Sequence, residues 1–206
     1  MIAIIDYGMG NLRSVEKAFE ACGASPKVTS SARDIENAAK IVLPGVGAFT
    51  AAVGELKKRK LFDLVKKRLQ SGVPYLGLCL GLQLLFEESE ESEGKTKAPG
   101  FGLIKGKVRR FRLNPNFKIP HMGWNEIRIR KKNCPLFKGI KNEDYFYFVH
   151  SYYGVPKDES WNAAVTDYGV RFSSAVWKET IFATQFHPEK SQSSGLKIIK
   201  NFAELK

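Results

Sequence analysis

The stretch YLGLCLGLQLLFEES, residues 75–89, combines an apolar run, two glycines and a helix-like pattern around one cysteine, Cys79. A free cysteine often behaves as a small buried hydrophobe. The flanking Gly77 and Gly81 favour another interpretation, because a G-x-S-x-G nucleophile occupies a sharp strand-to-helix turn that needs small neighbours. Cys79 would place sulfur where such enzymes carry a hydroxyl. A helix N-terminus also favours the thiolate form of cysteine, so this stretch predicts a reactive thiol after a buried strand.

The stretch belongs to a regular alternation of strands and helices in the first 90 residues. Short apolar runs predict buried strands, and apolar residues at helical spacing predict helices between them. The expected strands are residues 2–6, 25–31, 40–45 and 75–78, and the expected helices are residues 11–22, residues 51–70 and one that begins at Cys79. A βαβ series of this kind implies a parallel sheet covered by helices.

The second half of the chain has a different pattern. Short β-rich runs separated by turn residues extend from residue 102 to IFATQFHPE, residues 181–189, and predict added strands that are largely antiparallel. We expect the polar segment 87–100 to be an exposed loop that joins the two halves, and residues 195–205 to form a closing helix. A chain of 206 residues without an internal repeat is expected to form one domain.

Composition and charge argue against several classes of protein. The chain opens on a short apolar run without a secretory signal, and no apolar run reaches the roughly 18 residues of a membrane span, so we expect a soluble, cytoplasmic protein. Cys22, Cys79 and Cys134 lack a C-x-x-C pair, which argues against a disulfide framework or a metal site. The net charge of +12 permits nucleic-acid binding, but the basic run 55–69 keeps leucines at helical spacing and predicts a solvated helix face.

The missing base for Cys79 is expected in QFHPEKS, residues 185–191. Pro188 disfavours helical backbone at His187. Residues two apart in an extended segment share a face, so Glu189 can reach the ring of His187. Cys79, His187 and Glu189 thus predict a triad of nucleophile, base and orienting carboxylate. The α/β-hydrolases place the acid before the histidine, whereas here it follows the histidine by two residues.

GLCLG and FHPE, in this order, resemble the triad-type (class I) glutamine amidotransferases, in which a cysteine removes ammonia from glutamine. Four further segments resemble the glutaminase subunits of imidazole glycerol phosphate synthases, from histidine biosynthesis: IDYGMGNLRSVEKA (5–18), LPGVGAF (43–49), PHMGWN (120–125) and YFVHSYY (147–153). The resemblance covers essentially the whole chain. It implies an α/β, three-layer αβα fold around a mixed, flavodoxin-like sheet with additional antiparallel strands, in one glutamine amidotransferase domain over residues 1–206.

The resemblance also implies a heterodimer in which this chain hydrolyses glutamine and passes ammonia to a separate cyclase subunit, a (β/α)₈ barrel. The cyclase would make imidazole glycerol phosphate and aminoimidazole carboxamide ribonucleotide. The chain has no G-x-x-x-x-G-K-[ST] phosphate loop of its own, which agrees with divided labour. In DYGMGN the third glycine of a dinucleotide loop is replaced by Arg13, so we expect no cofactor.

Further site residues follow from the same family. The amide of Leu80, directly after the nucleophile, is one expected oxyanion donor, and the loop with Val46 and Gly47 would supply the second. By resemblance, glutamine would be held near Gly47, Leu80, Gln83, Glu91, Ser151 and Tyr152, and the cyclase interface around the ammonia passage would include Asn11, Met122, Trp124, Tyr147 and Lys190. On the residues alone, Glu91 could instead be a solvent-facing loop charge, and His150 is expected to orient a strand.

Three other functions stay open on the sequence. The glutaminase of another synthase, such as one that makes pyridoxal phosphate, would carry the same triad motifs, although LPGVGAF and PHMGWN favour histidine biosynthesis. A basic nucleic-acid-binding module with vestigial catalytic residues is disfavoured, because the aromatic residues gather in strand-like segments and not among the basic runs. A purely structural cap on an ammonia channel would not need Cys79.

Overall fold

A computed structural model describes residues 1–91 and 99–205, and up to residue 89 its strands and helices alternate. The elements of this half are β1 (Ile2–Ile5), α1 (Leu12–Ala21), β2 (Pro26–Thr29), α2 (Ala32–Glu36), β3 (Lys40–Gly45), α3 (Phe49–Lys58), α4 (Phe62–Gln70), β4 (Tyr75–Cys79), α5 (Leu80–Gln83) and β5 (Phe86–Ser89). All four strands predicted before residue 80 are present. The short helix α2 was not predicted.

Strands dominate the rest of the chain, together with three 3₁₀ helices (η). The elements are β6 (Ile104–Arg110), β7 (His121–Glu126), β8 (Arg128–Ile129), η1 (Pro135–Phe137), β9 (Tyr145–His150), β10 (Tyr152–Pro156), η2 (Glu159–Trp161), β11 (Asn162–Asp167), β12 (Arg171–Lys178), β13 (Ile181–Thr184), η3 (Pro188–Lys190) and α6 (Gln192–Ala203). The predicted β-rich half and closing helix are therefore confirmed.

The largest sheet lies at the centre of the fold. It has eight strands, in the order β2-β1-β3-β4-β13-β12-β11-β8. Strands β1, β2, β3 and β4 pair in parallel, as predicted, whereas β12, β11 and β8 pair antiparallel. The strand β13 differs from the largely antiparallel expectation for its half, because it pairs in parallel with β4 and antiparallel with β12. It therefore joins the two styles of pairing in one mixed sheet.

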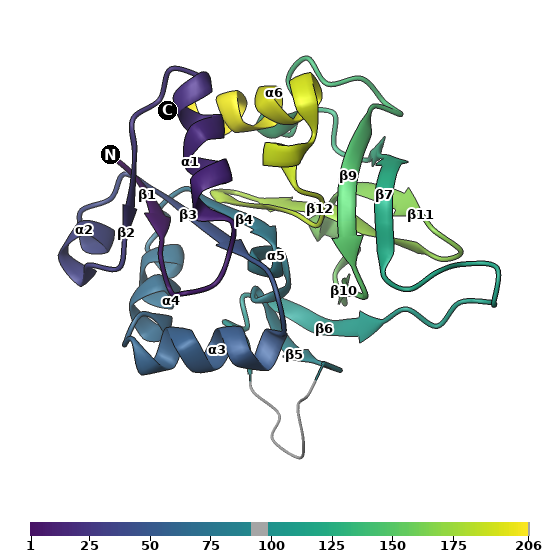
Figure 1. The fold of residues 1–206 in the computed structure, drawn as a ribbon, viewed down its shortest axis with the longest axis horizontal. Coiled ribbons are helices and arrows are strands. Elements are labelled where there is room, and N and C mark those ends of the chain that lie inside the picture. Colours follow the sequence, from purple (N-terminus) through teal and green to yellow (C-terminus); the bar gives the residue numbers. More distant parts are fainter. Residues whose placement is uncertain (92–98, 206) are drawn as a thin grey trace.

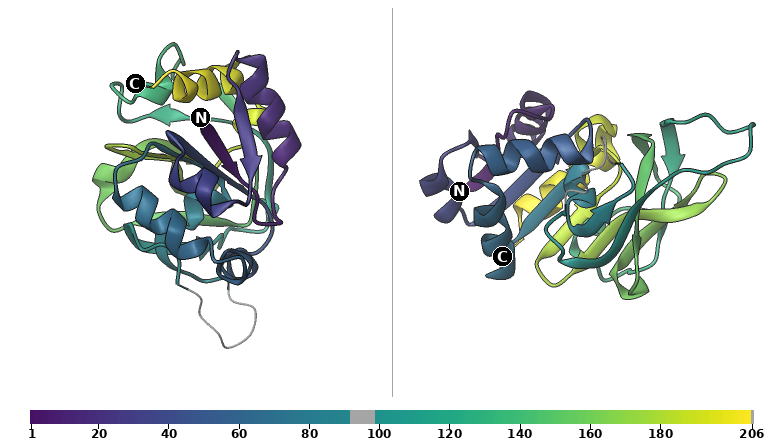
Figure 2. Two further views of the ribbon diagram at one scale, coloured as in Figure 1. Left: turned by 90° about the vertical axis from the view of Figure 1, so that its left-hand side faces the viewer. Right: turned by 90° about the horizontal axis from the view of Figure 1, so that it is seen from below.

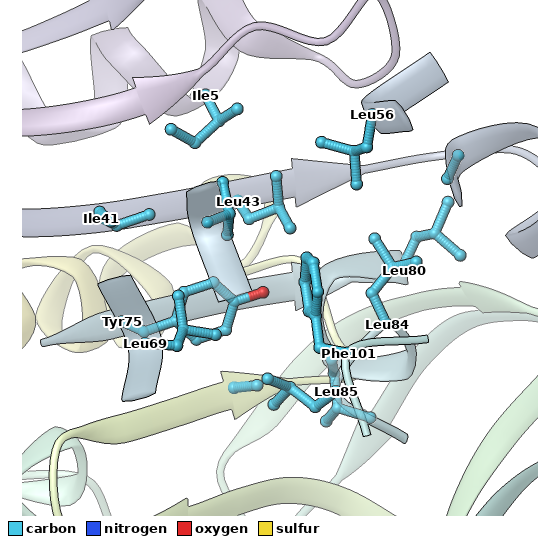
Figure 3. Close-up of a cluster of buried hydrophobic side chains, with 14 of the residues drawn as sticks. Ile5, Ile41, Leu43, Leu56, Leu69, Tyr75, Leu80, Leu84, Leu85 and Phe101 are labelled. Atoms are coloured by element: carbon cyan, nitrogen blue, oxygen red, sulfur yellow. The ribbon is translucent and has the colours of Figure 1, made fainter. Parts of the chain in front are cut away.

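Helices cover both faces of this sheet, which gives the predicted αβα arrangement: α1 and α6 lie on one side, and α3 and α4 on the other (Figures 1 and 2). The strands reach both layers because successive side chains point to opposite faces. Ile5 and Leu43 belong to the buried cluster under α3 and α4, shown in Figure 3, whereas Ile4 and Val42 belong to the cluster under α1 and α6.

Two smaller sheets stand beside the central one and extend the β-rich half. One has the order β10-β6-β5, and the other is the antiparallel pair β7-β9 (Figure 1). In the β7-β9 pair, His121 lies opposite His150 and Trp124 lies opposite Tyr147. These strands bring the segments PHMGWN and YFVHSYY together, although some 20 residues separate them in the chain.

Three sequence predictions need correction. The single helix expected over residues 51–70 is two helices, α3 and α4, and the break contains Lys60 with φ of +59°. The helix after Cys79 has four residues and is followed at once by β5. The loop predicted over 87–100 begins inside β5, and its residues 92–98 lie outside the described residues.

The most basic run behaves as the periodicity predicts, although two helices share it. Leu56, Leu61, Val65 and Leu69 are buried in the core, and the neighbouring lysines 57, 58, 60 and 67 are exposed. In the described ranges 1–91 and 99–205, no helix has the length and apolarity to cross a membrane. The same ranges contain no group of three metal-ligating side chains arranged around a common point.

Candidate active site

Cys79 lies where β4 ends and α5 begins, in the strand-to-helix turn that its sequence predicts. Its φ is +52° and its ψ is −99°, a backbone conformation that residues with a side chain rarely adopt. Such strain is typical of functional positions that the surrounding structure holds in place. The cysteine is buried, with 7% of its surface exposed.

The flanking glycines are required by close packing of the backbone. A Cβ atom on Gly77 would lie 2.6 Å from the carbonyl oxygen of Gly81, and one on Gly81 would lie 2.0 Å from the carbonyl oxygen of Leu43. The hydroxyl of Tyr75 donates a hydrogen bond of 2.8 Å to the same Gly81 carbonyl. The glycines therefore let α5 pack directly against β3 and β4, which fixes the turn around Cys79.

His187 reaches Cys79 because β13 lies next to β4. The pairing is parallel and places Thr184 opposite Leu78, so the carboxyl ends of both strands meet at one edge of the sheet. His187 Nδ1 lies 2.8 Å from Glu189 Oε1, and both side chains are almost fully buried. The predicted contact is present, but its predicted backbone is only partly right: His187 is extended, whereas residues 188–190 form the 3₁₀ turn η3.

The charges around His187 favour its protonated form. Burial alone lowers the pKa of an imidazole. Here the charge of Cys79 and the hydrogen bond and charge of Glu189 outweigh burial and raise the pKa of His187 to about 10. The ring nitrogen that faces away from Glu189, Nε2, is buried and has no nitrogen or oxygen partner within residues 1–91 and 99–205. This nitrogen is thus available to exchange a proton with a reactant.

A cavity of about 540 Å³ opens onto Cys79 and His187. It is lined by Val46, Gly47, Ala48, Cys79, Leu80, Gln83, Glu91, Pro120, Val149, His150, Ser151, Tyr152 and His187. Every residue that the sequence analysis assigned to glutamine binding or to the oxyanion site is in this set. The structure thus brings together six separate stretches of the chain, while the roles of these residues stay a prediction.

Two of the lining residues have local features that bear on their expected roles. Gly47 has a φ of +90°, so a side chain here would be strained, and Val46 beside it is partly exposed. Glu91 does not extend into solvent, because its Oε2 accepts a hydrogen bond of 2.8 Å from the backbone N–H of Phe49. That N–H is at the first turn of α3, so Glu91 ties the segment after β5 to the cavity wall.

Gln185 is a residue of this site to which the sequence analysis gave no role. Its side chain is fully buried, and its Nε2 lies 3.5 Å from Cys79 Sγ. Its Oε1 lies 3.2 Å from Gln83 Nε2, which in turn lies 3.0 Å from the carbonyl oxygen of Tyr152. The available signal was a polar residue directly after the apolar strand IFAT, two positions before His187.

His121 and His150 form a second buried histidine site, on β7 and β9. His150 Nδ1 lies 2.8 Å from the carbonyl oxygen of Tyr152, so this nitrogen carries the hydrogen. His150 Nε2 must then accept from His121 Nδ1, 3.0 Å away. Burial lowers the pKa of His121 to about 4 and that of His150 to about 3. The pair is neutral near pH 7, as suits the strand-orienting role expected of His150.

The residues expected at the cyclase interface are placed on or near the β7-β9 pair. Met122 and Trp124 are large and exposed, at 62% and 46% of their surface. The ring of Tyr147 lies 6.1 Å from that of Trp124, and Lys190 Nζ lies 5.8 Å from the centre of the Tyr147 ring. Asn11 caps α1, a helix that adjoins η3, by accepting a hydrogen bond of 3.4 Å from Ser14.

Known proteins resemble this chain in sequence and in fold. Residues 3–205 match the family Glutamine amidotransferase class-I. The imidazole glycerol phosphate synthase subunit HisH of Gloeothece citriformis is 52% identical over 98% of this chain and 94% of its own length. The subunit of the same name from Caldanaerobacter subterraneus subsp. tengcongensis is 51% identical over 100% of this chain and 98% of its own.

The fold has relatives of known structure as well. A crystal structure of a glutamine amidotransferase aligns with a TM-score of 0.75 at 19% identity and covers 100% of both chains, which shows a shared fold. Family match, sequence relatives and fold agree with one another. The chain belongs to the class I glutamine amidotransferases and, among these enzymes, to the family of the imidazole glycerol phosphate synthase subunit HisH.

Proposed function

We propose that this chain is the glutaminase subunit of an imidazole glycerol phosphate synthase and hydrolyses glutamine with Cys79, His187 and Glu189. One observation carries the proposal: the strained Cys79 and the ring of His187 open onto the same cavity as all six residues expected to bind glutamine. A volume of about 540 Å³ leaves room for a molecule of this size. We further propose that residues 1–206 act as one glutamine amidotransferase domain.

In the first half of the reaction, the Cys79 thiolate attacks the side-chain amide carbon of glutamine. The carbonyl electrons move to oxygen, and backbone amides of Leu80 and of the Val46–Gly47 loop stabilise this oxyanion. Protonated His187 then gives its proton to the amide nitrogen, the C–N bond breaks, and ammonia leaves. A glutamyl thioester on Cys79 is the result.

In the second half, neutral His187 removes a proton from water, which attacks the thioester. The C–S bond breaks, glutamate leaves, and Cys79 returns as a thiolate beside protonated His187. Glu189 holds the orientation of the His187 ring through its 2.8 Å contact with Nδ1. It also stabilises the positive charge of this ring before the first half of the reaction and after the second. The raised pKa of His187 suits a group that must hold a proton until the amide bond breaks.

The ammonia is proposed to pass to a cyclase subunit, a (β/α)₈ barrel, in a heterodimer. The relatives are named as synthase subunits, which supports a division of labour between chains. Exposed Met122 and Trp124, with Tyr147 and Lys190 beside them, offer an apolar patch with a positive charge for this contact. The three unpaired thiols, Cys22, Cys79 and Cys134, support a place in the reducing cytoplasm.

The test is release of glutamate from glutamine by this chain alone and by the chain with a cyclase subunit and its ribonucleotide ligand. We expect release to be stimulated by the ligand-bound partner and to fall to background in Cys79→Ala. A Cys134→Ala variant is the matched control, because Cys134 is a buried thiol whose pKa is raised by burial to about 11. It should keep its activity.

Other results would point to other functions. A complex that forms but releases no glutamate, or releases it equally with Cys79→Ala, would disprove the triad. A cyclase of histidine biosynthesis that does not bind, while another synthase barrel does, would support the glutaminase of a different pathway. Tight, salt-dependent RNA or DNA binding without glutaminase activity would support the nucleic-acid-binding alternative.

A further inference from the structure

The side-chain amides of Gln83 and Gln185 have orientations that hydrogen bonding fixes. The carbonyl oxygen of Tyr152 can only accept, so the nitrogen of Gln83, and not its oxygen, must face it at 3.0 Å. The same nitrogen lies 3.2 Å from the side chain of Gln185, which must therefore present its own oxygen as acceptor. The nitrogen of Gln185 is then left to face Cys79 Sγ, 3.5 Å away.

The hydrogen-bonded series from the Tyr152 carbonyl through Gln83 and Gln185 to Cys79 is called the relay here. It begins at a backbone atom that is itself held in place. The Tyr152 carbonyl also accepts a hydrogen bond of 2.8 Å from His150 Nδ1, so it has two donors and cannot turn toward another. Gln83 and Gln185 have 4% and 0% of their surface exposed, which leaves water little access to compete for their amides. The orientation of the Gln185 N–H toward sulfur is thus set by a chain of three fixed contacts.

We propose that Gln185 is a positioning residue for the nucleophile, whose N–H donates to the Cys79 thiolate and aims it into the cavity. The proposal rests on the glutaminase function above and adds a group outside the triad. A hydrogen bond to the charged form of an acid stabilises that form. It would also hold the sulfur between His187 and the amide carbon of glutamine during attack.

The relay has a second consequence, because Gln83 lines the cavity. Both hydrogens of its nitrogen are used, by Tyr152 and by Gln185, so its oxygen is the atom left for an incoming ligand. Gln83 would therefore present an acceptor, which suits the ammonium group of an amino acid. Gln185 links this recognition to the nucleophile.

Two variants separate the donor from the acceptor of Gln185. Gln185→Glu keeps an oxygen for Gln83 but removes the N–H toward sulfur and adds a negative charge there. Gln185→Met fills the space without either bond. The measurement is the rate of iodoacetamide alkylation of Cys79 against pH, followed on the Cys79 peptide by mass spectrometry, with the full chain alone and in its complex. This readout does not depend on glutaminase activity.

We expect the pH midpoint of alkylation to rise by about one unit in Gln185→Met and by more in Gln185→Glu. For glutamine hydrolysis, Gln185→Glu should lower kcat about tenfold or more with KM nearly unchanged, whereas Gln185→Met should change both. Thr184→Val is the matched control, since Thr184 is equally buried on the same segment but donates to the Phe186 carbonyl. Its profile should match that of the unchanged chain.

Alkylation midpoints that stay the same in both folded variants would overturn the proposal, whether or not glutamine is hydrolysed. If one variant does not fold, as judged by circular dichroism and binding to the cyclase, the alkylation midpoint of the other variant tests the proposal. A shifted midpoint in a protein that never hydrolyses glutamine would support the positioning of Cys79 and contradict the proposed function. The two failures are therefore distinguishable.

Discussion

The region that holds the proposed triad and the β7-β9 pair both bury histidine, but the histidine is protonated in the first region and neutral in the second. His187 is 3% exposed, and its pKa is raised to about 10, because the charges of Cys79 and Glu189 outweigh burial. His121 and His150 are 3% and 5% exposed, and burial lowers their pKa values to about 4 and about 3. Equal burial thus yields a protonated ring in one place and neutral rings in the other.

What differs between the regions is the set of partners. Glu189 offers a carboxylate 2.8 Å from His187, whereas the partners of the histidine pair are another ring, a backbone carbonyl and the side chain of Asn125. Neutral partners satisfy hydrogen bonding without repaying the cost of burying a charge. The comparison teaches that a histidine of the active site is recognised by its charged neighbours and not by its burial.

The largest effect is expected when His187 loses its carboxylate partner, because its surroundings then become more like those of His121 and His150. Glu189→Gln keeps the shape of the side chain but removes the carboxylate, so the pKa of His187 should fall and the ring should no longer be held for proton transfer. We expect kcat for ligand-stimulated glutamine hydrolysis to drop by about 10³-fold. The measurements are steady-state kinetics of the complex and the titration of His187 followed by NMR.

Glu126→Gln is the control for this substitution. Glu126 is a carboxylate of β7 that pairs at the surface with Arg128, 3.3 Å away. This variant should keep both the rate and the titration. If Glu189→Gln kept the rate within about threefold, the role of Glu189 as the orienting carboxylate would be wrong.

The second-largest effect is a loss of stability in acid, caused by the neutral pair His121 and His150. Between about pH 6.5 and pH 4 the unfolded chain protonates His121 and His150 while the folded chain does not, so the unfolded state binds more protons. The free energy of unfolding should therefore fall as pH is lowered, by up to about 1.4 kcal/mol per pH unit for each histidine. Below about pH 5.5 His187 is protonated in both the folded and the unfolded state and adds no slope.

Urea unfolding at pH 6.5 and pH 5.0 measures this slope. His150→Asn keeps a donor for the Tyr152 carbonyl but removes one titrating ring, so about half of the slope should disappear. Phe19→Leu, in the core under α1, is the control. It should lower stability equally at both pH values and leave the slope unchanged, whereas an unchanged slope in His150→Asn would show that the pair is not neutral.

The smallest effect is expected at the point where the two regions meet. The Ser191 hydroxyl donates to the carbonyl of His187 at 2.6 Å and accepts from the N–H of Tyr147 at 3.0 Å, so it ties β9 to the triad turn. Ser191→Ala leaves that partly buried N–H without its side-chain partner, which costs about 1–3 kcal/mol of stability. Thermal unfolding should show the loss, while glutamine hydrolysis falls only a few fold.

Ser194→Ala provides the reference, because the Ser194 hydroxyl donates a long hydrogen bond of 3.3 Å to the side chain of Asp144. Its unfolding temperature should stay close to that of the unchanged chain. A Ser191→Ala variant as stable as Ser194→Ala would show that the two regions are joined by their backbone contact alone, from the His187 N–H to the Tyr147 carbonyl at 2.9 Å.

Prediction from sequence succeeded where a short stretch of residues is enough to determine the local structure. The strands of the parallel half are runs of apolar residues between turn signals, and each was found within a few residues. The turn at Cys79 was marked by its two glycines, but only the structure shows why they are needed: a Cβ atom on either glycine would lie 2.0 or 2.6 Å from a backbone carbonyl oxygen. The triad contact was predicted from the spacing in His187-Pro188-Glu189, while the 3₁₀ turn that makes it was not.

Prediction failed where the outcome depends on distant partners. The segment 51–70 has helical spacing throughout, and the sequence does not show that Lys60 leaves the helical conformation there. Nothing in IFATQ tells that β13 pairs in parallel with β4, because register is set by the whole sheet. Without that register Gln185 could not be assigned to Cys79, nor could the different protonation states of the three histidines be foreseen.

The sequence by itself predicted the nucleophile, base and carboxylate of the proposed triad and determined the parallel first half and the family, because each depends on residues close together in the chain or on their order. Only the tertiary structure decided that β13 joins the parallel strands, that six separate stretches of the chain line one cavity, and that Gln185 faces sulfur. These features depend on burial and on contacts between residues up to 106 positions apart, which no local pattern encodes.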